Sequence, residues 1–273
     1  MLNLFDKIIQ VNTNSFSKSF FLLQQEAILA NKAILLGFES MVKGGFCDYK
    51  KGFYYSAYFQ ISIGIERILK LIKISQYMFN NNYKTPSQKV LRDFGHNIQK
   101  MYEAVASESE DSTFDDISKY KSMLIFIDDF SKSKVRYHNI SEQEEVNDPI
   151  LKWKIIIDGI IKNDISTTIS RNVKNKVVSS LNPSLVAQDI TDNTGYCNAL
   201  LYDKLVDKAN YWAIWNIIEL IRPLIGVLDN ISSTNNNLSR VNDSLHIPYY
   251  SEMFSFVYTD KKTVLKRKIW GHL

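Results

Sequence analysis

Apolar residues recur at intervals of three and four along much of this chain, and that spacing is typical of one buried face of an α-helix. The first stripe predicts a helix that begins near Phe16 and ends before the Lys43-Gly44-Gly45 turn. The second stripe predicts a helix from Phe53 to Lys73. We therefore expect these two helices to form an antiparallel hairpin.

Helix-start signals divide the next part of the chain. The segment 85–88, Thr-Pro-Ser-Gln, combines a capping threonine with a proline at the first helical position and predicts the start of a third helix. Its apolar stripe reaches Val105, and Gly95 either lies inside this helix or breaks it before His96. A fourth stripe, from Ile117 to Phe130, predicts a fourth helix that ends near Ser131.

A second set of helices is predicted after residue 148. Asp148-Pro149 is a helix-start signal, and the apolar run from Tyr211 to Leu228 predicts a central buried helix that bends at Pro223. The chain of 273 residues has only 10 glycines and 5 prolines, and 45% of its residues are hydrophobic. These features predict an all-α fold with a substantial core.

The polar and acidic stretch 141–148 is the best candidate for a boundary within the chain. The predicted organisation is a helical bundle over residues 1–145 and a helical C-terminal extension, residues 146–273, that packs on it.

Charge and cysteine content exclude several classes of protein. The net charge is +4, from 33 basic and 29 acidic residues, which is compatible with nucleic-acid contact without requiring it. The two cysteines, Cys47 and Cys197, are too few for a disulfide scaffold. The N-terminus lacks the features of a signal peptide, and the longest apolar run contains Glu219 and Arg222, which disfavours a membrane span. We expect a cytoplasmic protein without a membrane partner.

The common catalytic motifs are absent. The sequence has no glycine-rich phosphate loop, no HExxH and no GxSxG. The four histidines lack the spacing of metal ligands, so we expect no metal and no cofactor.

Two pairs of arginine and histidine remain as candidates for chemistry. Arg92 and His96 are one helical turn apart, and Arg136 and His138 follow the fourth helix. Cleaving RNA without a metal ion requires a base that deprotonates the 2′-hydroxyl and a cation that stabilises the phosphate, and histidine and arginine can fill these roles. The alternative is structural, because arginine at a helix end often binds free carbonyls. Both interpretations stay open.

Two features of the C-terminal half have a similar ambiguity. Tyr211, Trp212 and Trp215 could stack on bases, but aromatic residues in an apolar helix are more often part of the core, which is the interpretation we favour. The basic clusters 261–262 and 266–268 could attract phosphate, although charged residues near a helix C-terminus are usually a solvated face.

Three blocks in the first half carry a resemblance to a known family. They are Tyr55-Ser-Ala-Tyr-Phe-Gln-Ile-Ser-Ile-Gly-Ile-Glu66-Arg-Ile-Leu-Lys70, Gly95-His96-Asn97-Ile98-Gln99-Lys100-Met101-Tyr102 and Arg136-Tyr137. In this order they resemble the HEPN superfamily of helical bundles, over roughly residues 10 to 145. His138 stands where the family's Arg-Tyr-Pro turn has proline.

The resemblance implies an up-down bundle of four or five helices, a homodimer, and a place among RNA-cleaving toxins, defence proteins and noncatalytic RNA-associated modules. Catalytic members of the family separate their arginine and histidine by four to six residues, whereas Arg92 and His96 are separated by three, and Arg136 and His138 by one. Our first hypothesis is a protein of defence or RNA metabolism that binds RNA or a partner protein, with metal-independent cleavage through Arg136, His138 and His96. The alternative is a noncatalytic helical module that binds another protein.

Overall fold

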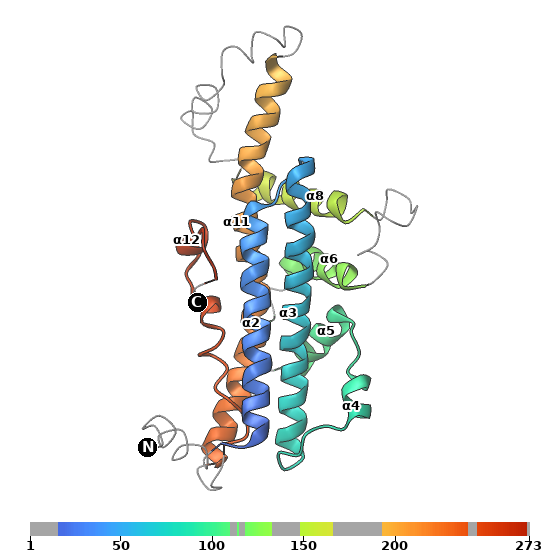
Figure 1. Ribbon diagram of the computed structural model, residues 1–273, viewed down its shortest axis with the longest axis vertical. Helices are drawn as coiled ribbons and strands as arrows, with labels where there is room; N and C mark the ends of the chain where they lie inside the picture. The colour runs from blue at the N-terminus through green and yellow to red at the C-terminus, as the bar shows by residue number, and fades with distance from the viewer. Residues whose placement is uncertain are drawn as a thin grey trace, which may run out of the picture.

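Three long helices, α2, α3 and α11, lie side by side and form the body of the protein (Figure 1). They span Lys18–Lys43, Asp48–Asn80 and Asn193–Ser239. Four shorter helices lie along one side of this body, and the C-terminal segment runs along the other side (Figure 1). The short helices are α4 (Gln88–Asp93), α5 (Ile98–Glu108), α6 (Lys121–Ser131) and α8 (Pro149–Ile160).

This computed structural model describes residues 16–109, 114, 118–132, 148–165, 193–239 and 245–271, with only the backbone described for 193–201 and 235–239. Within these ranges every secondary-structure element is a helix, so the predicted all-α class is confirmed. The β pairing in the same ranges is an isolated bridge between Phe16 and Leu245.

The predicted hairpin is confirmed, because α2 and α3 pack against each other along their lengths (Figure 1). The side chain of Ser17 caps α2 by accepting a hydrogen bond from the backbone N–H of Phe20 (3.3 Å). α3 is longer at both ends than the predicted 53–73 helix. Its additional turns keep the helical apolar spacing, as Met78 is fully buried.

Two glycines set how closely the hairpin packs. A Cβ added at Gly37 would collide with the Ile61 side chain, and one added at Gly64 would collide with the Ile34 side chain and lie 3.1 Å from the Ala30 carbonyl oxygen. The missing side chains therefore let the two backbones approach each other.

The third predicted helix is divided in two. α4 ends at Asp93, Gly95 adopts a left-handed φ of 70°, and α5 starts at Ile98. The apolar stripe allowed Gly95 either to lie inside one helix or to break it before His96. The structure shows that Gly95 breaks the helix. The cap of α4 is also corrected, because Ser87 rather than Thr85 accepts the capping hydrogen bond.

The helix start at Asp148-Pro149 is confirmed. The Asp148 carboxylate accepts a hydrogen bond from the backbone N–H of Ile150 (2.8 Å), and Pro149 occupies the first turn of α8. α8 continues as a π-helix over Ile161–Ile165. The fourth predicted helix is shorter than expected, because α6 begins at Lys121.

α11 is the predicted central buried helix, with Pro223 inside it. Its stretch Tyr202–Thr234 is long and apolar enough to cross a membrane, with a mean hydropathy of 1.3, but 61% of the apolar window lies buried inside the protein. This burial is what a core helix requires.

The last described segment, residues 245–271, lies along α2 and α11, and we call it the C-terminal strap (Figure 1). It contains a 3₁₀ turn, Ser255–Tyr258, and the short helix α12, Lys261–Val264. Its end is fixed to α2, since a Glu39 carboxylate oxygen accepts hydrogen bonds from the backbone N–H groups of Trp270 (3.1 Å) and Gly271 (2.6 Å).

One hydrophobic core includes residues from both sides of position 145. Trp153 of α8 packs on Tyr58 of α3 with ring centroids 5.1 Å apart, and the Tyr54 hydroxyl donates a hydrogen bond to Asn210 of α11 (2.8 Å). The boundary between 145 and 146 itself lies outside the described residues. The two-part organisation stays a prediction, while the described parts of both halves share a core.

Candidate functional site

A cluster of three polar residues joins α3 to the loop before α5. The His96 Nδ1 atom lies 2.8 Å from Glu66 Oε1, and the Lys70 Nζ atom lies 2.7 Å from the same carboxylate oxygen. Lys70 Nζ is also 3.3 Å from His96 Nδ1. We call these three residues the His96 cluster.

The local backbone explains how His96 reaches α3. Gly95 turns the chain with its positive φ. A Cβ at this position would meet nothing within 4 Å, so glycine is favoured here by the left-handed backbone conformation and not by a lack of room for a side chain. Asn97 then caps α5 by accepting a hydrogen bond from the backbone N–H of Lys100 (2.7 Å). His96 is held between these two fixed residues.

Glu66 and His96 differ sharply in their exposure. The His96 side chain is 83% exposed, whereas the Glu66 side chain is 18% exposed. Burial raises the pKa of Glu66, but the hydrogen bonds and positive charges of Lys70 and His96 outweigh it, so the pKa lies below the ordinary value. The cluster therefore holds an ionised carboxylate that orients an exposed imidazole through Nδ1 and leaves Nε2 accessible from solvent.

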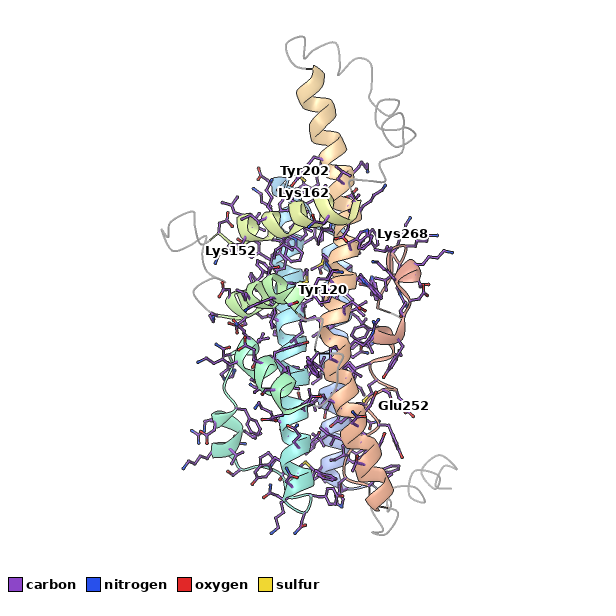
Figure 2. All side chains as sticks on the ribbon, turned by 180° about the vertical axis from the view of Figure 1, so that it is seen from behind. Tyr120, Lys152, Lys162, Tyr202, Glu252 and Lys268 are labelled. Atoms are coloured by element: carbon purple, nitrogen blue, oxygen red, sulfur yellow. The ribbon has the colours of Figure 1, made fainter. Side chains whose placement is uncertain are left out.

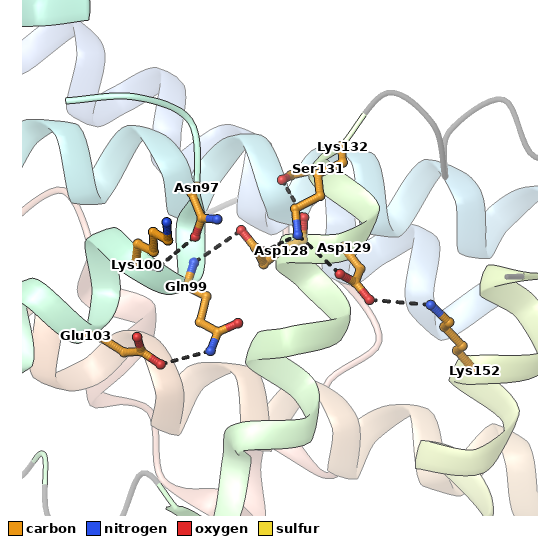
Figure 3. Close-up of polar contacts among 9 residues, drawn as sticks. All are labelled: Asn97, Gln99, Lys100, Glu103, Asp128, Asp129, Ser131, Lys132 and Lys152. Atoms are coloured by element: carbon orange, nitrogen blue, oxygen red, sulfur yellow. Dashed lines mark hydrogen bonds and ion pairs between the residues drawn. The ribbon is translucent and has the colours of Figure 1, made fainter. Parts of the chain in front are cut away.

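A second polar network fixes the start of α5 against α6 and α8 (Figure 3). Asp128 of α6 is only 2% exposed, and its carboxylate accepts a hydrogen bond from the backbone N–H of Gln99 (3.2 Å). Lys132 Nζ lies 2.8 Å from the same carboxylate, and Asp129 lies between Lys132 (3.3 Å) and Lys152 of α8 (3.4 Å). The network positions α5, and with it the loop that carries His96.

The two predicted arginine–histidine pairs have different outcomes. Arg92 and His96 do not share a helix, because α4 ends at Asp93, and the Arg92 Nε–H donates to the Gln88 carbonyl of its own helix (3.3 Å). The alternative in which one helix aligns the two side chains is therefore excluded. Arg136 and His138 lie outside the described residues, so their predicted role stays a prediction.

The tryptophans of α11 pack against the core on one side. Trp212 and Trp215 are partly buried, and Lys261 of the C-terminal strap lies over the Trp212 ring, 3.9 Å from its centroid. The Arg222 guanidinium lies 5.1 Å from the Trp215 centroid. The Lys261 contact attaches the strap to α11. Both tryptophans pack against the core without being buried in it, so the core interpretation is confirmed only in part.

Sequence reasoning missed the partners of His96. Glu66 and Lys70 carried the signal of an i, i+4 ion pair, but nothing local placed His96 beside them. Asp128 was also missed, although its position four residues after Leu124 falls on the apolar face of α6. A carboxylate on a buried face is a signal for a polar network.

No cluster of three or more histidine, cysteine, aspartate or glutamate side chains suited to a metal ion occurs among the described residues. A hollow of about 290 Å³ lies between α6, α8 and α11, and its lining is mixed, with apolar side chains beside Lys119, Asp164 and the amides of Asn163 and Asn216. His96 does not line it. The candidate site is thus an open surface.

Comparisons with models of protein families, with curated proteins and with solved structures give no match to this chain. The class that the fold and the site define is an all-α protein with an exposed, carboxylate-oriented histidine. The functional argument therefore depends on the chemistry of the His96 cluster.

Proposed function

We propose that this chain is a HEPN-like cytoplasmic protein of defence or RNA metabolism that binds RNA and cleaves it without a metal ion. The observation that carries the proposal is the 2.8 Å contact between Glu66 Oε1 and Nδ1 of the exposed His96. A base that is oriented by a carboxylate is the arrangement that general-base catalysis uses.

The proposed reaction starts at the 2′-hydroxyl of RNA. With its proton on Nδ1, the His96 imidazole donates a hydrogen bond to Glu66, and its Nε2 lone pair accepts the 2′-hydroxyl proton. The 2′-oxygen then forms a bond to phosphorus, the bond to the 5′-oxygen breaks, and solvent or His138 protonates the leaving oxygen. The products are a 2′,3′-cyclic phosphate and a 5′-hydroxyl end.

Positive charge at the site supports the same reaction. Lys70 is the nearest cation among the described residues, with Nζ 3.3 Å from His96 Nδ1 and 2.7 Å from Glu66, and in this proposal it adds positive charge on the Nδ1 side of the imidazole. Arg136, 40 residues after His96 in sequence, is the second cation of the proposal.

The test is incubation of purified protein with total RNA in EDTA. We expect cleavage that leaves cyclic phosphate ends, and we expect His96→Ala and the double variant Arg136→Ala/His138→Ala each to lower the rate by at least about a hundredfold. Arg92→Ala is the matched control, because Arg92 bonds to its own helix and should leave the rate unchanged. Intact RNA under all conditions would exclude the ribonuclease.

A second candidate function, a noncatalytic interaction module, is favoured by a different observation. α2 exposes large apolar side chains on its outer face, including Leu22 (52%), Leu29 (43%) and Leu36 (49%). These three leucines are seven residues apart, so the stripe is symmetric about Leu29 and complementary to a second, antiparallel copy of itself. A homodimer through α2 is the partner that this surface fits.

The dimer has its own test. Light scattering coupled to size exclusion should give the mass of a dimer for the wild type and of a monomer for Leu29→Glu. Ile155→Glu is the control, because Ile155 of α8 is even more exposed (73%) but lies outside the stripe. A monomeric wild type would remove this support for the interaction module. It would also contradict the homodimer that the resemblance implies, while the RNA test would still decide whether the chain cleaves RNA.

A further inference from the structure

The net charge of the chain is concentrated at one place. The nine residues 260–268 contain five basic residues and one acidic residue, a net charge of +4 that equals the net charge of the whole chain. The rest of the sequence is therefore neutral in sum. A positive potential is expected around these residues, which belong to α12 and the end of the C-terminal strap.

The strap presents most of this charge outward. The single carboxylate, Asp260, accepts hydrogen bonds from the backbone N–H (3.0 Å) and the hydroxyl (2.6 Å) of Thr263 and so caps α12. Lys261 turns inward over Trp212. Lys262 and Lys266 are exposed.

Two further cations adjoin these lysines. Lys268 is exposed and points away from the body of the protein (Figure 2). The Arg267 guanidinium lies over the Trp270 ring, 4.8 Å from its centroid, and its Nε–H donates to the Ile269 carbonyl (3.1 Å). Lys262, Lys266 and Arg267 line a shallow hollow together with Asp260 and Thr263.

The strap holds these side chains in a fixed place. Trp270 is fully buried, its ring packs on Phe38 of α2 with centroids 5.0 Å apart, and its backbone N–H binds Glu39. At the other end of the strap, the Tyr250 hydroxyl is hydrogen-bonded to the Ser75 hydroxyl of α3 (2.8 Å). The basic residues are thus carried by a segment attached to two of the long helices.

We infer that the cationic end of the C-terminal strap, formed by Lys262, Lys266, Arg267 and Lys268, is a docking surface for the phosphate backbone of RNA. This inference rests on the proposed association with RNA and adds a surface to it. The strap and α4–α5 lie on opposite sides of the long helices (Figure 1). The surface therefore contacts RNA away from His96 and affects affinity for long strands more than the chemical step.

The test uses a fluorescein-labelled 20-nucleotide oligouridylate with 2′-O-methyl groups, which cannot undergo the proposed cleavage. Anisotropy gives its affinity for the full chain over a range of salt concentrations. We expect Lys262→Glu/Lys266→Glu to weaken binding about tenfold or more and, because two phosphate contacts are lost, to reduce the slope of log K against log salt by roughly 1.4 units. Lys18→Glu/Lys121→Glu is the matched control, with the same charge change at exposed positions outside the strap.

The possible outcomes separate this inference from the proposed function. Equal affinity of the two double variants, with the wild type binding RNA, would overturn the docking surface alone. Failure of the wild type to bind RNA would overturn both. Binding of phosphatidylserine vesicles that the strap variant loses, with RNA affinity unchanged, would assign the strap to a membrane surface and also overturn the inference. Circular dichroism checks that each variant is folded.

Discussion

At the scale of single residues, Glu66 connects stability to pH. Its pKa is below the ordinary 4.5, because hydrogen bonds from Lys70 and His96 outweigh burial. A carboxyl group whose folded-state pKa is lowered stabilises the fold above its unfolded pKa, and this stabilisation is lost as the pH falls through the folded value.

We therefore predict that Glu66→Gln lowers the free energy of unfolding by about 1 kcal/mol at pH 7, and that this loss becomes smaller as the pH falls through the folded-state pKa of Glu66. Thermal unfolding followed by circular dichroism at several pH values measures this difference. Glu103→Gln is the control, since Glu103 bonds to Gln99 at the surface. A loss that does not become smaller as the pH falls below 4.5 would contradict the role of the ionised Glu66.

Two adjacent aspartates of α6 provide a sharper comparison. Asp128 is buried, accepts the Gln99 N–H and pairs with Lys132, whereas the partly exposed carboxylate of Asp129 pairs with Lys132 and Lys152. Asp128→Ala removes the acceptor of the part-buried Gln99 N–H and an ion-pair partner of Lys132, so it should lower the free energy of unfolding by about 1–3 kcal/mol. Asp129→Ala should cost less than about 1 kcal/mol. Urea denaturation measures both free energies of unfolding. Equal losses would show that the buried position of Asp128 adds nothing to stability.

At the scale of elements, the α2–α3 hairpin depends on close contact at its glycines. Gly64→Ala should lower the free energy of unfolding by about 1–3 kcal/mol, because the added methyl group collides with Ile34. Gly52 lies in the same helix, but a Cβ there meets nothing within 4 Å. Gly52→Ala should therefore stabilise the protein by about 0.5–1 kcal/mol through helix propensity. Opposite signs in urea denaturation are the expected result, and two stabilising substitutions would contradict the close packing.

At the scale of the whole molecule, the C-terminal strap closes the core. Trp270 is fully buried between the strap and α2, while its neighbour Ile269 is 63% exposed. Trp270→Ala should lower the free energy of unfolding by about 3–5 kcal/mol. Ile269→Ala should change it by no more than about 0.5 kcal/mol. If calorimetry instead shows that both variants unfold at the wild-type temperature, the strap is not part of the cooperative unit.

Much of the fold was predictable because a helix requires a regular pattern of apolar and capping residues within a short stretch of sequence. The 3.6-residue apolar period marked α2, α3 and α6, and Asp148 marked the start of α8 through its capping chemistry. The C-terminal strap has no such pattern. Its buried aromatic residues have no helical period, and their burial depends on α2 and α11.

The His96 cluster was likewise predictable only in part. The sequence by itself determined the Glu66–Lys70 pair, since four residues make one helical turn, and it marked His96 as a candidate. Only the tertiary structure decided that His96 meets Glu66, because 30 residues and the turn at Gly95 separate them. Contacts across such separations follow from how whole helices pack, and no local pattern of residues encodes that packing.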